Sequence, residues 1–329
     1  MKQINELFSN MATLAQHAPA VDTNLSLVDL KAAFGSSWKQ LTALVPDNVL
    51  DAIADGSDDN LRQALRTALA NRTLANHAIF SAYHQRKAGT DVYKYEVEQM
   101  QRAYMENYFS AMDTLLTELT ALASPESGRD ASAPAESGTE DTAPADNGTG
   151  DTAPADNGTM PDVGHLFSLC RWYQMASTVR IKTAEQFDMI YPIDLSYLFF
   201  FRTLPLQKEV ADGRIGSYYD RIKALERDDK ERLLSLADMA LVKKTVAKAL
   251  RRFDILEFPP TIRNLFDESH ANRNGKDESE RAVSLADMLD GEADALINDL
   301  DTLLESENSL DVSSMSAYNE PDDKIVMMP

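Results

Sequence analysis

Residues 57–89 read SDDNLRQALRTALANRTLANHAIFSAYHQRKAG, and this stretch predicts one long helix. Ser57 is expected to be the N-cap, and the negative charges of Asp58 and Asp59 suit the positive end of the helix dipole. Residues 86–89 (RKAG) provide a cationic last turn followed by a stop. Between these ends apolar residues recur at helical spacing: Leu61, Leu65, Ala68, Leu69, Ile79, Phe80 and Tyr83.

A second long helix is expected over residues 91–123, where apolar residues follow one helical face. Upstream, residues 27–53 predict shorter helical pieces, with a turn at residues 34–37 (FGSS) and a break at Pro46. The first 123 residues therefore predict a helical domain. The stripe of the second helix consists of Val97, Met100, Tyr104, Ala111, Leu115, Leu119 and Leu122.

The C-terminal half repeats this order of predicted elements, short pieces followed by two long helices. Residues 187–225 predict short elements, including a buried segment from Leu195 that stops at Pro205, and a helix follows over residues 229–256. A last helix is expected over residues 279–305. The shared order leaves two hypotheses open, an internal duplication or two unrelated helical hairpins, which are common. The stripe of the last helix is Leu285, Leu289, Ala293, Leu296, Leu300 and Leu303.

Residues 124–164 differ from both halves in composition. They consist almost entirely of Ala, Pro, Ser, Thr, Gly, Asp and Glu and contain a ten-residue tandem repeat, APAESGTEDT followed by APADNGTGDT. Such a composition has too little to bury and predicts a disordered tether. The expected fold is therefore mainly α, with two helical-bundle halves joined by a disordered acidic linker. The predicted domains are residues 1–123, the linker 124–164, residues 165–305, and a flexible acidic tail 306–329.

The net charge of −21 is concentrated in two stretches. Residues 124–164 carry nine acidic side chains and one basic, and residues 267–329 carry seventeen acidic and four basic. The rest of the chain is balanced, which argues against binding to a phosphate backbone. The nearest candidate for nucleic-acid contact is a cationic group that alternates with apolar positions, and the alternative is the solvated face of an amphipathic helix. This group is Lys243, Lys244, Lys248, Arg251 and Arg252.

The single cysteine, Cys170, excludes an intramolecular disulfide and favours a reducing compartment. No apolar stretch approaches the roughly 20 residues that a membrane-spanning helix needs, and residues 1–6 are not followed by the apolar core of an export signal. We therefore expect no membrane association.

A search for catalytic and metal-binding motifs finds none, so we expect no catalytic residue, no cofactor and no metal. His77 and His84 are seven residues apart, which is about two helical turns and too far to share a metal directly. Cys170 follows His165 by five residues, a pair that carries no argument for nucleophilic catalysis. An enzyme with an unrecognised site remains one hypothesis. Aromatic residues expected in the core rather than in a ligand site are Trp38, Trp172, Tyr191, Tyr197, Phe199, Phe200 and Phe201.

Several segments together resemble a known family. They are residues 4–8 (INELF), the helical segment 28–53, the helix 61–83 and residues 104–116 (YMENYFSAMDTLL). Residues 293–304 (ADALINDLDTLL) are similar to the last of these. These patterns resemble the small helical proteins of Bacteroides-type phages and prophages that are regarded as head–tail connector or adaptor-like. The linker and the acidic tail depart from the family pattern.

The resemblance implies a non-enzymatic structural protein of the virion, assembled in the cytoplasm of the bacterial host. Its copies would form a ring at the portal, contact portal or tail proteins, and let DNA pass with only non-specific contact. A negative charge balance suits such a channel wall. The alternative is a bacterial cytoplasmic scaffold or chaperone-like protein that holds partner helices.

The last residues of the chain combine a polar stretch with an apolar end. Residues 319–323 (NEPDD) lead to Lys324, after which Ile325, Val326, Met327 and Met328 follow in succession. One hypothesis is that these four apolar residues dock on a neighbouring subunit or a portal-like partner, with residues before them acting as a soluble spacer. The alternative is a frayed end without a role.

Overall fold

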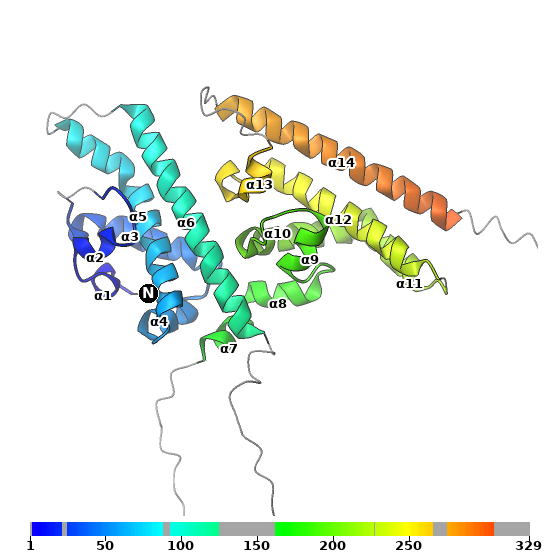
Figure 1. The fold of residues 1–329 in the computed structure, drawn as a ribbon, viewed down its shortest axis with the longest axis horizontal. Coiled ribbons are helices and arrows are strands. Elements are labelled where there is room, and N and C mark those ends of the chain that lie inside the picture. The colour runs from blue at the N-terminus through cyan, green and yellow to red at the C-terminus, as the bar shows by residue number, and fades with distance from the viewer. Residues whose placement is uncertain are drawn as a thin grey trace, which may run out of the picture. The chain divides into compact units, whose positions relative to one another are not determined.

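The computed structural model describes residues 2–21, 25–87, 93–124, 162–226, 228–265 and 275–305, and every regular element in these ranges is a helix (Figure 1). The expected mainly α-helical class is therefore confirmed. Contacts divide the chain into two compact units. Unit 1 contains Met1–Thr178, Leu195–Arg202 and Leu256–Pro259, and unit 2 contains Val179–Asp194, Thr203–Ile255 and Pro260–Pro329.

Unit 1 is built on an antiparallel hairpin of two long helices, α5 (Asp59–Lys87) and α6 (Lys94–Ala123) (Figure 1). The structure confirms both predicted helices, but their N-terminal details differ. Asp58, rather than Ser57, caps α5, because its Oδ1 accepts a hydrogen bond from the Asn60 nitrogen at 2.9 Å. A carboxylate at this position supplies both the cap and a charge that the helix dipole favours.

Four shorter helices precede the hairpin and pack on it or on one another. The break expected at Pro46 is confirmed, since Pro46 is the N-cap of the fourth helix. The turn expected at residues 34–37 is wrong, because the third helix runs through Gly35. Burial of Phe34 and Trp38 outweighs the cost of a glycine inside a helix, about 1 kcal/mol. The helices are α1 (Ile4–Leu7), α2 (Met11–Ala15), α3 (Leu27–Leu41) and α4 (Asp47–Asp55).

Two short helices after the expected linker, α7 (Val163–Ser168) and α8 (Arg171–Thr178), belong to unit 1. A Cβ atom on Gly164 would lie 2.5 Å from the Leu122 carbonyl oxygen, so only glycine allows α7 to approach α6 this closely. The Tyr173 hydroxyl donates a hydrogen bond to the Ala123 carbonyl at 3.2 Å. These contacts hold both helices against the end of α6.

The boundary of the compact units therefore differs from the expected one. The sequence predicted a C-terminal domain that begins at residue 165, whereas contacts place the chain up to Thr178 in unit 1. The linker also ends before residue 164, since the Asp162 side chain caps α7 by accepting hydrogen bonds from the Gly164 and His165 nitrogens. Residues 125–161 of the expected linker lie outside the described residues.

In unit 2, α12 (Lys230–Arg252) is the central helix. It contacts α9, α11, the π-helical turn η1 and, most extensively, α14. The expected helix to residue 256 is too long, because the backbone is already extended at Phe253. The bounds of the other elements are α9 (Ala184–Ile190), η1 (Ala211–Ile215), α11 (Gly216–Lys223), α13 (Pro260–Arg263) and α14 (Gly275–Glu305).

The aromatic run at residues 199–201 lies in α10 (Tyr197–Val210), and all three phenylalanines are buried as expected. The stop expected at Pro205 is wrong, since α10 continues to Val210. Proline inside a helix removes one backbone hydrogen bond. Leu204 and Leu206 are buried on either side of it, and their burial favours the helix over a break. A short 3₁₀ turn, η2 (Ile255–Glu257), follows α12.

The last helix, α14, lies antiparallel along α12 (Figure 1). Its buried stripe overlaps only partly with the expected one. Leu289, Ala293 and Leu300 are buried as predicted, whereas Leu285, Leu296 and Leu303 are only half-buried along the edge of the seam. Two alanines, one isoleucine and one further leucine occupy the rest of the seam, and the small alanines let the two helices approach closely. The buried residues are Ala282, Ala286, Leu289, Ala293, Ile297, Leu300 and Leu304.

Candidate interaction surfaces

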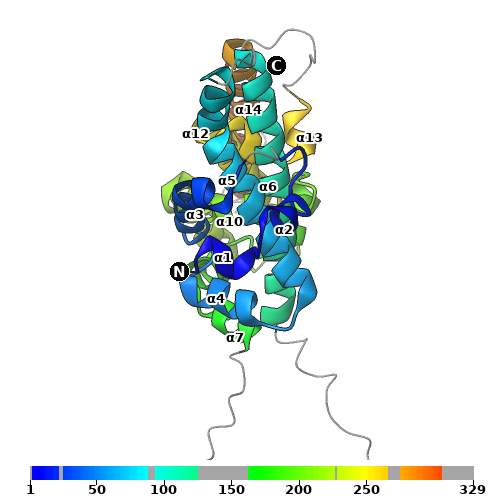
Figure 2. The same cartoon turned by 90° about the vertical axis from the view of Figure 1, so that its left-hand side faces the viewer.

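The face of α5 that points towards α3 changes character along its length. Near its middle, α3 covers this face, where Arg72 Nε donates to the Gln40 side chain at 2.5 Å and Asn76 donates to Ser37 Oγ at 3.0 Å. Figure 2 shows α3 beside α5, and in Figure 1 the last turns of α5 extend beyond α1–α4. The cover therefore ends near Asn76.

Beyond Asn76 the same face of α5 carries large apolar side chains that remain in solvent. Ile79 is 63% exposed, Phe80 is 60% exposed and Tyr83 is 64% exposed. Their spacing places them on one side of the helix, opposite the inner face that carries Ala78 and Ala82. We call the side chains of Ile79, Phe80 and Tyr83 the uncovered α5 face.

Cationic and aromatic residues border this face at the end of the hairpin. Arg86 and Lys87 follow on the next turn of α5 and are exposed. At the start of α6, Tyr93 and Tyr95 are also exposed and stack on each other with ring centroids 5.8 Å apart. This end of the hairpin therefore combines aromatic surface with positive charge, a combination that is enriched in protein–protein interfaces.

A second feature of unit 1 is a polar groove of about 870 Å³ between the loop after α2 and the two hairpin helices. Asn71 lies at its base and is fully buried. Its side-chain nitrogen donates to the carbonyl oxygens of His17 and Thr67, both at 2.8 Å, and its oxygen accepts from Asn107 at 3.3 Å. These bonds tie the loop to both helices. The remaining polar lining consists of Gln16, Asn60, Gln63, Ser110, Thr114 and Glu118.

The chemistry of this groove is that of neutral hydrogen bonding. Among the residues that line it, Glu118 is the one with a formal charge. Burial lowers the pKa of His17, with a smaller contribution from Arg66, so its imidazole is neutral at pH 7. The His17 Nδ1 atom lies 3.2 Å from the Thr67 hydroxyl oxygen. The side chains of Asn71 and His17 are thus engaged with the protein itself, which indicates a structural role.

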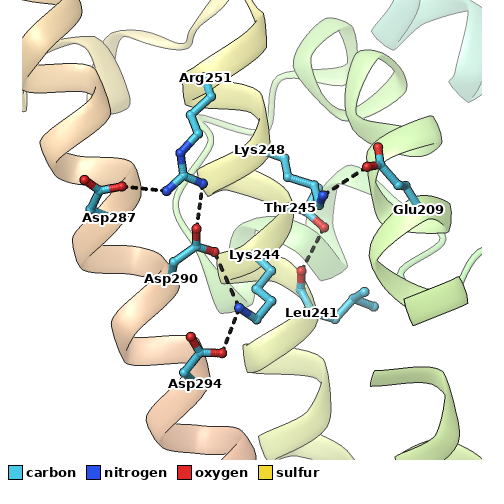
Figure 3. A network of polar contacts seen from close by, with 9 residues as sticks. All are labelled: Glu209, Leu241, Lys244, Thr245, Lys248, Arg251, Asp287, Asp290 and Asp294. Carbon is cyan, nitrogen blue, oxygen red and sulfur yellow. Dashed lines mark hydrogen bonds and ion pairs between the residues drawn. The ribbon is translucent and has the colours of Figure 1, made fainter. Parts of the chain in front are cut away.

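The cationic group on α12 is paired with carboxylates, and Figure 3 shows the pairs of Lys244, Lys248 and Arg251. Arg251 bridges Asp287 at 2.7 Å and Asp290 at 2.6 Å on α14, and Lys244 contacts Asp294 at 2.8 Å. Lys243 pairs with Glu292 on the same helix. The acidic residues of α14 lie opposite these three cations. The group therefore belongs to the face of an amphipathic helix, which is the second of the two interpretations.

The remaining two cations of the group, Lys248 and Arg252, converge on Glu209 at the end of α10. Their hydrogen bonds, with Arg252 as the larger cause, lower the pKa of Glu209 to about 2. Such exposed pairs individually contribute little to stability.

A further polar cluster in unit 2 centres on Asp238 of α12. Arg180 binds its two oxygens at 2.9 and 3.0 Å, and the Tyr219 hydroxyl donates to one of them at 2.7 Å. Burial, followed by the charge of Asp238, raises the pKa of Tyr219 well above its usual range. A tyrosine that keeps its proton in this way anchors α11 to α12 and is poorly suited to be a catalytic base.

Of the residues that the sequence singled out for chemistry, the structure describes the side chains of His77, His165 and Cys170. His77 is buried on α5, with its ring 5.9 Å from that of Phe80, and the side chain of His84 lies outside the described residues. Cys170 is buried, and burial raises the pKa of its thiol. Within the described ranges no three His, Cys, Asp or Glu side chains are grouped to hold a metal ion. The candidate docking residues Ile325, Val326, Met327 and Met328 lie outside the described residues.

Sequence reasoning missed the uncovered α5 face because it counted Ile79, Phe80 and Tyr83 in the same apolar pattern as Leu61 and Leu65. One signal could have revealed it. From residue 78 onwards, apolar residues occupy two opposite faces of the helix, whereas one buried face would require only Ala78 and Ala82. The apolar side chains of Ile79 and Phe80 are therefore not needed for the packing of the hairpin.

Comparison of this chain with protein-family models, curated protein sequences and solved structures finds no match. Among the helices of the described residues, none is both long enough and apolar enough to cross a membrane.

Proposed function

We propose that this chain is a non-enzymatic structural subunit that assembles with copies of itself, as a head–tail connector or adaptor does when it forms a ring at a phage portal. The observation that carries the proposal is the uncovered α5 face, where α3 leaves Ile79, Phe80 and Tyr83 in solvent. The resemblance of residues 4–8, 28–53, 61–83 and 104–116 to connector proteins supplies the particular assembly.

The physical case for assembly rests on the cost of leaving this face in water. Three large apolar side chains that are each about 60% exposed present on the order of 300–400 Å² of surface. The largest apolar patch on a typical monomer is about 300–600 Å², so this face is comparable to it, and such a patch is often functional. The rigid helix beneath it means that little conformational entropy is lost when the face is covered.

The charge distribution supports the same proposal. Acidic residues are concentrated in residues 124–164 and 267–329, whereas the end of α5 carries Arg86 and Lys87. Copies of one chain can therefore present opposite charges to each other, which favours a head-to-tail contact that closes into a ring. The excess of negative charge also suits a channel through which DNA passes without sticking.

The test is sedimentation velocity over a hundredfold range of protein concentration, with negative-stain electron microscopy of the largest species. We expect a closed ring whose population rises with concentration. The Phe80→Ser/Tyr83→Ser variant should shift assembly to at least tenfold higher concentration, because it removes most of the apolar surface. Met189→Ser is the matched control, since Met189 is 87% exposed but belongs to unit 2 and not to the hairpin of unit 1.

A chain that stays monomeric over the whole range contradicts the proposal. A monomer that instead binds helical segments of other proteins through the same face supports the alternative, a bacterial scaffold or chaperone-like protein. Equal loss of assembly in the Met189→Ser control would show that the effect does not come from the α5 face.

A further inference from the structure

We propose that the uncovered α5 face binds residues 320–328 of a second copy of this chain, so that each subunit contributes one such face and one such segment to the assembly. This inference rests on the proposed self-assembly and names the contact that carries it. Ile325, Val326, Met327 and Met328 would cover Ile79, Phe80 and Tyr83, and the acids before them would lie near Arg86 and Lys87.

The size of the face selects a short segment over a folded surface. A stable interface between two globular surfaces buries about 800 Å² on each partner, of which roughly 450 Å² is apolar, whereas Ile79, Phe80 and Tyr83 expose on the order of 300–400 Å². Packing the same face of another copy against it would therefore bury less apolar surface than a stable interface usually has. Four consecutive apolar side chains on one short segment match the available area.

The charges also select this segment. Arg86 and Lys87 lie on the next turn of α5, so symmetrical pairing of two α5 faces would bring like charges together. Residues 320–323 (EPDD) carry three carboxylates, and Lys324 separates them from the apolar residues, so residues 320–324 keep a net charge of −2 (3 acidic − 1 basic). In antiparallel orientation, an acidic stretch followed by an apolar one therefore matches the apolar face of α5 and the cationic turn that follows it.

Side-chain chemistry adds a further reason. Met327 and Met328 have flexible, polarizable side chains that fill irregular surfaces and contact aromatic rings favourably. Phe80 and Tyr83 supply two exposed rings on the face. Ile325 and Val326 provide branched apolar groups suited to the side of Ile79.

The chain is long enough to reach another subunit. Nineteen residues, 306–324, separate the end of α14 from Ile325. At about 3.3 Å for each residue they span up to about 60 Å when extended. A contact in which the segment of one copy binds the face of the next is heterologous, and heterologous contacts close into rings when the rotation allows.

The test uses a synthetic peptide of residues 319–329 labelled with fluorescein and measures its anisotropy as full-length protein is added. The protein carries Ile325→Asp/Met327→Asp, so that its own segment does not compete. We expect saturable binding that weakens at least tenfold when Phe80→Ser/Tyr83→Ser is added. Met189→Ser should leave the affinity unchanged. A peptide with Ile325→Asp/Met327→Asp should lose binding to the same protein, which excludes misfolding as the cause.

The outcomes separate the inference from the proposed function. If the wild-type chain assembles but the peptide fails to bind, or binds equally well to the Phe80→Ser/Tyr83→Ser protein, the inference is overturned and self-assembly stands on another contact. If the peptide binds the α5 face while the wild-type chain stays monomeric, the segment folds back onto its own chain, and both the second copy and the proposed function are overturned. Binding that requires the face, together with assembly, supports both.

Discussion

The packing of α14 on α12 predicts that two leucines of the same helix differ in their contribution to the free energy of unfolding. The comparison replaces Leu289 or Leu296 by alanine. Leu289 is only 2% exposed and belongs to the buried seam, whereas Leu296 is half-buried at its edge. Removing a buried leucine side chain costs its transfer free energy and leaves a cavity, in total about 2–5 kcal/mol. At Leu296 water fills the space, so only part of the transfer term is lost, about 1 kcal/mol.

The assay is urea unfolding monitored by far-UV circular dichroism. The free energy of unfolding is taken from the transition that the substitution shifts. Leu289→Ala should lower that free energy by at least twice as much as Leu296→Ala. Leu303→Ala, another edge position, should behave like Leu296→Ala. Equal costs at Leu289 and Leu296, or a larger cost at Leu296, would refute the assignment of seam and edge.

Four further predictions each concern a single residue. The carboxylate of Glu209 has a pKa of about 2 instead of 4.5 in the folded chain, so its stabilising effect is present above about pH 4.5 and is lost as the pH falls towards 2. Thermal melts of Glu209→Gln and wild type should therefore differ at pH 7 and converge at pH 2. Arg251→Gln should lower the free energy of unfolding by about 0.2–1 kcal/mol in low salt and by less in 1 M NaCl. The buried Cys170 thiol should react with Ellman's reagent at least tenfold more slowly in the native protein than in urea. Gly164→Ala should lower the free energy of unfolding by about 1–3 kcal/mol, because its methyl group would meet a carbonyl oxygen of α6.

The long helices could be predicted from the sequence because their signals are local. Apolar spacing and charged ends define α5, α6, α12 and α14 without reference to distant residues, and the structure confirms all four. The break at Pro46 is equally local, since proline is well suited to precede a helix. The mainly α-helical class follows from these elements alone.

The details that were wrong depend on tertiary packing. Gly35 and Pro205 both lie inside helices. Each helix continues because it buries a large neighbour, Trp38 in the first helix and Leu204 in the second. The approach of α7 to α6 could not be predicted, because it depends on the close contact at Gly164, which has no signature in composition. In each case the free energy of burial outweighs a local preference.

The candidate surface was only partly predictable for a related reason. Composition singled out the apolar residues from Ile325 onwards, since they stand out in a polar stretch. The exposure of the α5 face could not be predicted, because the spacing of Phe80 and Tyr83 suits a buried stripe as well as an exposed one. What decides between the two is that α3 covers this face of α5 only as far as Asn76 and leaves Phe80 and Tyr83 exposed.

The central claim is that one copy's terminal segment binds the α5 face of the next, and mixing two defective variants tests it most directly. The Phe80→Ser/Tyr83→Ser variant keeps its segment but lacks the face, and the Ile325→Asp/Met327→Asp variant keeps the face but lacks the segment. Each alone should be monomeric by sedimentation velocity at a concentration where the wild type assembles. An equimolar mixture should form a heterodimer and nothing larger, because one intact contact remains. A mixture that stays monomeric, or variants that assemble alone as the wild type does, would contradict the account.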